Sequence, residues 1–339
     1  MKGLWWKLLA TLLLLFTAII GLRTPLGPSI VATSTTRIAP GPLELEIQGY
    51  GTHFHADQQH AWLVNDGQRI CATRISVLAE DRMRASFTVP AGLRVAMTDL
   101  GIFNAIDGPV VRHAAFYTDS LGRGISEEPC PAGKSLHLGF TFPNRDILNE
   151  SIRNLFFHVP MWFTMVTLMA IGVWKSIRTL RTNSLETDRE AAAAVGTGLV
   201  FGVLGLTSGS LWARVTWETW WTSDPKLNGA AAGVLIYLAY MVLRGSVPEP
   251  AKRARLSAIY SIFAFAFMLL FFFVLPRLND SLHPGNGGNP AFNTYDLDDR
   301  LRTVFYPACI GWILMGLWMY DLRNRMLRLQ HAHSDANNR

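Results

Sequence analysis

Two histidines stand at the ends of long apolar segments, where a membrane helix would meet water. His158 follows the apolar residues 155–157, and His283 lies in the segment Asp280-Ser281-Leu282-His283. An ionisable side chain at the end of a membrane helix is a candidate for function, although an interfacial histidine can equally serve only as an anchor. Two neutral imidazoles that approach one iron from opposite faces would complete six-fold coordination if a planar ligand supplied the other four donors. His158 and His283 are therefore candidate metal ligands.

A tryptophan-rich segment lies between these histidines in the sequence. Scattered tryptophans would form an ordinary aromatic belt at a membrane surface, but here they are concentrated in one short loop. Indole faces suit a large flat apolar ligand, and a neighbouring cation could meet acidic groups on its edge. Haem has both features, and its iron binds imidazole. The residues that predict such a site are Trp212, Trp217, Trp220, Trp221, Asp224 and Lys226.

Membrane helices must position these residues. The chain is 50% hydrophobic and only 17% charged. Its apolar residues are collected in runs near the length of about 20 residues that a helix needs to cross a hydrocarbon core. Six such runs are predicted, at 4–22, 155–174, 191–211, 227–243, 256–275 and 304–320. We therefore expect an all-α polytopic membrane helix bundle with six transmembrane helices.

The distribution of charge predicts how the bundle is oriented. The net charge of +6 could indicate nucleic-acid binding, but the basic residues collect after the second, fourth and sixth runs, at 175–181, 244–255 and 323–328. Cytoplasmic loops of membrane proteins are enriched in lysine and arginine. This predicts a multi-pass protein of the cytoplasmic (inner) membrane with both termini inside, residues 23–154 outside, and no nucleic-acid partner. The first run could be a signal peptide, but no A-x-A-like site follows it, which favours an uncleaved anchor.

The external region is expected to contain a small β domain. Residues 43–47 alternate apolar and polar, residues 61–64 end at the turn signal 65–67, and residues 84–89 form another candidate strand. Several short strands at this spacing are typical of a β-sandwich. The segments Gln48-Gly49-Tyr50-Gly51-Thr52-His53-Phe54 and 87–90 resemble the IPT type of immunoglobulin-like domain. The predicted organisation is an anchor at 1–22, a linker at 23–42, the β-sandwich at 43–118, a connector at 119–150, a membrane domain at 151–325 and a cytoplasmic tail at 326–339.

Other groups in the external region carry weaker signals. His53, His55 and His60 could share a metal, but no cysteine or carboxylate completes a recognisable spacing, so solvated histidines are the favoured interpretation. Cys71 and Cys130 both fall outside, where a disulfide could persist, although the sequence does not show that they meet.

Residues 151–325 resemble the CcmC family of haem-handling membrane proteins in cytochrome c maturation, which carry a tryptophan-rich WWD segment. The matching segments occur in the family's order, at 157–160, 207–212, 217–227 and 281–284. The resemblance implies that His158 and His283 are the axial ligands of a transiently bound haem b, and that the tryptophans, Asp224 and Lys226 contribute to haem binding. Lys226 stands where the family usually has arginine, and Ser223 where it commonly has a further tryptophan.

The resemblance also implies partners. These are a periplasmic haem chaperone of the CcmE type and ABC transporter subunits of the CcmA/CcmB type, beside the lipid bilayer. The chain itself has no phosphate-binding loop of the G-x-x-x-x-G-K-[ST] type and no Ser/His/Asp or zinc-protease signature, so we expect no enzymatic activity.

Alternative functions come from other classes. The chain could be a cytochrome c haem lyase component of the CcsA/CcmF type, although those proteins typically have more spans and a second histidine pair within the membrane. It could also be a membrane-anchored receptor that binds a partner through its β-sandwich. A secondary transporter is disfavoured because the predicted spans hold almost no charged residues and show no inverted repeat.

Overall fold

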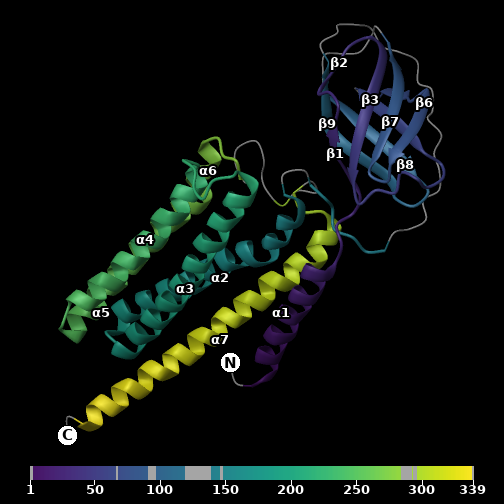
Figure 1. Cartoon of the computed structure of the whole chain (residues 1–339). Helices are drawn as coiled ribbons and strands as arrows, with labels where there is room; N and C mark the ends of the chain where they lie inside the picture. Colours follow the sequence, from purple (N-terminus) through teal and green to yellow (C-terminus); the bar gives the residue numbers. More distant parts are fainter. Residues whose placement is uncertain are drawn as a thin grey trace. The chain divides into compact units, whose positions relative to one another are not determined.

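The computed structural model describes residues 3–65, 68–90, 97–118, 139–145, 148–283, 292 and 296–337. The chain forms two compact units: Thr24–Glu150, and Met1–Arg23 together with Ser151–Arg339. The first unit is built of strands and the second of helices (Figure 1). The predicted combination of a helical membrane bundle and an inserted β-sandwich is confirmed.

Six helical segments of the described chain are long and apolar enough to cross a membrane. One of them, α5, passes without a break through a π-helical turn at Leu270–Val274 into α6. The helices are α1 (Trp5–Arg23), α2 (Leu155–Thr182), α3 (Leu185–Thr216), α4 (Pro225–Ser246), α5 (Pro250–Leu269), α6 (Leu275–Leu278) and α7 (Asp299–Asn337). A 3₁₀ turn at Asn149–Asn154 leads into α2. In Figure 1, α1 lies alongside the long helix α7.

Helices α2 and α3 approach closely because α3 presents a row of glycines. Small residues let membrane helices pack backbone to side chain, which matters because the hydrophobic effect does not drive association within lipid. A Cβ on these glycines would lie only 2.6–3.0 Å from the nearest side-chain atom of α2. The pairs are Gly198 with Met169, Gly202 with Met165, Gly205 with Trp162, and Gly209 with His158.

A buried ion pair joins α3 and α4 at the end of the bundle far from His158. The Arg244 guanidinium donates to both carboxylate oxygens of Asp188, at 2.6 and 2.9 Å. The side chains are 14% and 5% exposed, so the pair is shielded from water. Helix α7 continues through the predicted tail at 326–339 as far as Asn337. Within this part of α7, Arg328 pairs with Glu190 of α3 at 3.0 Å.

The strand unit is a β-sandwich. Its strands are β1 (Ser29–Thr33), β2 (Arg37–Ile38), β3 (Gly41–Tyr50), β4 (His60–Asn65), β5 (Gln68–Cys71), β6 (Arg74–Ala79), β7 (Arg82–Val89), β8 (Met97–Asn104) and β9 (Gly108–Thr118). One sheet has the order β1-β3-β7-β6 and the other β2-β9-β8-β4-β5. Leu45 and Phe87 of the first sheet share a core with Leu63 and Leu100 of the second.

The stretch 23–42, predicted to be a linker, instead contains strands. Strand β1 pairs antiparallel with β3, and β2 pairs parallel with β9. The abundance of proline and glycine hid them, since short edge strands need only a few β-branched residues such as Ile30 and Val31.

Most of the predicted connector lies outside the described residues, but within it Phe142 forms a β-bridge with Leu26. Cys71 is disulfide-bonded, and Cys130 lies outside the described residues.

Candidate functional site

His158 lies near the start of α2 and faces α3. Its Nδ1 is 3.1 Å from the Ser208 hydroxyl oxygen, and that hydroxyl in turn donates to the Leu204 carbonyl at 2.8 Å. A hydroxyl carries one proton, and a carbonyl can only accept, so the Ser208 oxygen is left to accept from Nδ1–H. The hydrogen on Nδ1 leaves the Nε2 lone pair available to a metal.

Aromatic rings and a glycine fix the orientation of the His158 ring. It packs edge-on against Trp162 at 6.2 Å and against Trp212 at 5.7 Å, measured between ring centroids. Gly209 gives it room, because a Cβ there would be 2.6 Å from the imidazole Cε1. Trp162 itself packs at 5.2 Å on Phe272 of the π-helical turn, a type of irregularity that is frequent at functional sites.

Asp224 is the N-cap of α4 and is only 6% exposed. Its Oδ1 accepts hydrogen bonds from the backbone N–H groups of Lys226 at 2.8 Å and Leu227 at 3.4 Å. Aspartate is favoured at this position because its oxygen satisfies N–H groups that have no partner within the helix. The capping role fixes the carboxylate in the protein interior.

The same carboxylate holds the segment after α6. It accepts from the Ser281 hydroxyl at 2.9 and 3.1 Å and from the Leu282 backbone N–H at 2.7 Å. Burial by itself would raise the pKa of Asp224, but the hydrogen bonds it accepts outweigh burial and hold its pKa below the usual value. Asp224 is therefore ionised, and it connects His283, through its two preceding residues, to the start of α4.

His283 lies between this carboxylate and a tryptophan. Its Nδ1 is 3.3 Å from Asp224 Oδ1, and its ring meets Trp217 edge-on at 4.9 Å. Burial lowers the pKa of His283; Asp224 opposes this shift and Lys226 adds to it, so the net shift is downward. The imidazole is therefore neutral at neutral pH. A lone pair on Nδ1 would be repelled by the carboxylate oxygen 3.3 Å away, so the proton of the neutral ring lies on Nδ1 and Nε2 is again the nitrogen available to a metal.

The tryptophans of the loop divide into two kinds. Trp212 and Trp217 each contact one histidine, and Trp212 Nε1 also donates to Ser151 at 3.0 Å. Trp220 and Trp221 instead expose 57% and 40% of their surface. The structure thus offers two exposed indoles beside two half-buried ones.

The candidate residues gather at one end of the helical unit. Trp212 near the end of α3 contacts His158, and Trp217, which caps the same helix, contacts His283. Four residues of this site were not predicted as site residues: Ser208, Trp162, Gly209 and Ser281. The run of small residues at 207–210, directly before Trp212, could have indicated Ser208 and Gly209, because small residues in a membrane helix permit a neighbouring helix to approach closely.

No cluster of three or more His, Cys, Asp or Glu side chains that could hold a metal ion occurs in the described part of the chain. Haem iron does not need one, because the porphyrin supplies four ligands and the protein at most two. The donor set around His158 and His283 therefore fits haem better than a free metal ion.

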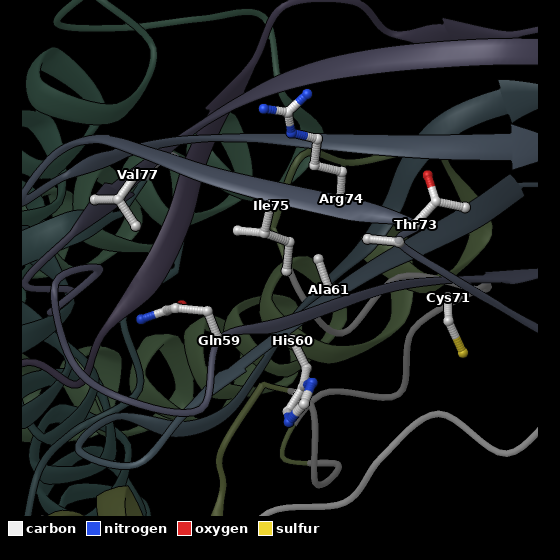
Figure 2. A pocket seen from close by; sticks show the side chains of 9 residues that line it. Gln59, His60, Ala61, Cys71, Thr73, Arg74, Ile75 and Val77 are labelled. Carbon is white, nitrogen blue, oxygen red and sulfur yellow. The ribbon is translucent and has the colours of Figure 1, made fainter.

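A cavity of about 410 Å³ lies in the β-sandwich and is lined by β6 residues such as Ile75 and Val77 (Figure 2). Its lining also includes the polar residues Gln59, His60 and Arg74. The lining has a single imidazole and no tryptophan. It lacks the paired donors of the helical unit, so this cavity is not the candidate haem site.

Comparison with known proteins agrees with this geometry. The family model described as heme exporter protein C matches residues 131–336. Heme exporter protein C of Paracoccus denitrificans is 30% identical over 198 residues, which cover 55% of this chain and 77% of that protein. The Rhodobacter capsulatus protein of the same name is 29% identical over 199 residues, again 55% and 77%. A cytochrome c biogenesis protein CcsA of Prochlorococcus marinus is 35% identical over 82 residues, 24% of this chain and 26% of that protein. The chain therefore belongs to the heme exporter protein C (CcmC) family and has a role in haem delivery for cytochrome c maturation.

Proposed function

We propose that the protein binds haem at the outer face of the cytoplasmic membrane, with His158 and His283 as axial ligands, and delivers it to a periplasmic chaperone of the CcmE type. The observation that carries this proposal is that both imidazoles are oriented through the same nitrogen, Nδ1. They lie at one end of the bundle, and each turns Nδ1 to a protein oxygen. Both Nε2 atoms are thereby available to iron.

The surrounding residues have distinct roles in this proposal. Trp212 and Trp217 support the imidazole edges, while the exposed Trp220 and Trp221 offer indole faces to the porphyrin. Lys226 provides a positive charge for an acidic group on the edge of haem. The protein holds and presents its cargo without acting as an enzyme, and any nucleotide-driven step belongs to ABC subunits of the CcmA/CcmB type.

The first test is the visible spectrum of the purified protein, oxidised and reduced, beside His158→Ala and His283→Ala. A low-spin bis-histidine spectrum that weakens in either variant supports the proposal. His113→Ala is the matched control, because that imidazole is 67% exposed on the separate β-sandwich unit. Absence of haem from the wild type, even after haem is supplied, would refute the proposal and favour the receptor hypothesis.

The orientation is tested by introducing one cysteine at a time into a Cys309→Ala background, in which Cys71 is disulfide-bonded. Ser223 lies in the tryptophan-rich loop and Ser246 at the other end of α4, and both are exposed. A maleimide that does not cross membranes should label Ser223→Cys in intact cells. Ser246→Cys should react only after the membrane is permeabilised. The reverse pattern would place the candidate site on the cytoplasmic side.

The haem lyase alternative is favoured by one observation, the short similarity to CcsA. It predicts that the purified protein attaches haem covalently to an apocytochrome carrying Cys-x-x-Cys-His. Under the delivery proposal no attachment occurs unless other maturation proteins are added, and haem passes instead to the chaperone. Attachment by the purified chain alone would favour the lyase.

A further inference from the structure

The two candidate iron ligands are oriented by acceptors of different charge. His158 faces the neutral hydroxyl of Ser208 at 3.1 Å, and His283 faces the ionised carboxylate of Asp224 at 3.3 Å. In both cases the acceptor contacts Nδ1. The residue that orients a histidine ligand also sets how strongly the opposite nitrogen donates electrons to a metal.

The Ser208 hydroxyl can only accept from the imidazole. Its oxygen lies 2.8 Å from the Leu204 carbonyl and 3.2 Å from the Gly205 carbonyl, and both carbonyls require its single proton. A neutral acceptor polarises the Nδ1–H bond only weakly. Ser208 therefore fixes the tautomer of His158 and adds little to its basicity.

The Asp224 carboxylate is held in one position. Two backbone N–H groups of α4, the Ser281 hydroxyl and the Leu282 backbone N–H all donate to it. Because these donors keep it ionised, it attracts the Nδ1 proton of His283 much more strongly than a hydroxyl would. Such a carboxylate–histidine pair raises the electron density at Nε2.

We propose that Ser208 and Asp224 are the positioning residues for haem iron, and that their unequal charge makes His283 the stronger and His158 the weaker axial ligand. The inference rests on the proposed haem-binding function. It deepens that function by assigning each ligand its partner and its strength. An electron-rich imidazole stabilises ferric over ferrous iron, so the carboxylate lowers the reduction potential of the bound haem.

The test compares the haem affinity and the midpoint potential of the full chain with those of Ser208→Ala and Asp224→Asn. Asparagine keeps a capping oxygen for α4 and removes the charge, and its NH2 group replaces the oxygen that accepts from the Leu282 backbone N–H. Asp224→Asn should raise the midpoint potential and weaken haem binding by about 10- to 100-fold. Ser208→Ala should weaken binding by about fivefold, the effect of one neutral hydrogen bond, with a smaller change in potential.

Thr207→Ala is the matched control for Ser208→Ala. Its hydroxyl makes the same kind of bond, to the Val203 carbonyl four residues earlier at 2.9 Å. It lies one position away on α3 and is exposed. This variant should keep the affinity and the potential of the wild type.

The outcomes separate this inference from the function on which it rests. A wild type with a bis-histidine spectrum, and variants that match Thr207→Ala in affinity and potential, would overturn the inference and leave the proposed function intact. A wild type without that spectrum would overturn both. If Asp224→Asn does not fold, Asp224→Ser retains a capping oxygen without the charge, and the same upward shift is expected.

Discussion

Gly209→Ala tests whether the close approach of α3 to His158 sets the position of the imidazole. The added Cβ would lie 2.6 Å from the imidazole Cε1, 3.3 Å from Nδ1 and 3.5 Å from Nε2. Carbon atoms make favourable contacts at about 3.5–4.0 Å, so the ring must move by roughly 1 Å. That displacement exceeds the tolerance of about 0.5 Å within which a site must hold its groups.

The free-energy cost falls on the haem-bound state. Without haem, displacement of the ring weakens only its contacts with Ser208, Trp162 and Trp212, but iron coordination also requires its original position. Overpacking of this kind costs about 1–3 kcal/mol, and we expect this penalty to weaken haem binding by about 5- to 150-fold. Folding should be affected less, because alanine within a helix is more stable than glycine by roughly 0.5–1 kcal/mol.

The assay is a haem titration followed by the low-spin absorption bands, with thermal unfolding of the same samples in detergent. We expect weaker binding and a larger high-spin fraction, with an unfolding temperature close to that of the wild type. Gly245→Ala is the control, because a Cβ at that position of α4 would meet nothing within 4 Å. Equal haem affinity and spin state in Gly209→Ala and Gly245→Ala would refute the reasoning.

Two further substitutions test the interior of each unit. Arg244→Met leaves the buried Asp188 without its ion-pair partner, so the free energy of unfolding should fall by about 3–5 kcal/mol. Thermal unfolding should show this loss, while Arg325→Ala, which removes a side chain that is 61% exposed and pairs with Asp321, should behave as the wild type. Gly101→Ala would place a Cβ 2.1 Å from the Trp62 ring, so the β-sandwich should lose at least about 1–3 kcal/mol. Limited proteolysis of the full chain should then cleave the sandwich faster, and an unchanged cleavage rate would contradict the predicted clash.

The class of fold was predictable because its signals are local. A run of apolar residues specifies a membrane helix whatever its neighbours are, since the bilayer core imposes one length and one polarity. Alternation over 43–47 and 84–89 likewise predicted strands, which the structure contains within β3 and β7. The sequence also placed His158, His283 and the tryptophan loop on one side of the membrane, because the order of the spans determines the side.

The roles of Ser208 and Asp224 depended on the tertiary structure. Asp224 meets Ser281 and His283 across more than fifty residues, and Ser208 meets His158 across the α2–α3 pair. The strands β1 and β2 were missed within the predicted linker because proline and glycine are abundant there, although β1 pairs with β3 and β2 with β9. The sequence by itself determined the spans and the residue types available for chemistry. Only the tertiary structure decided which oxygen each imidazole faces, because such contacts depend on how the helices pack and not on the spacing of residues along the chain.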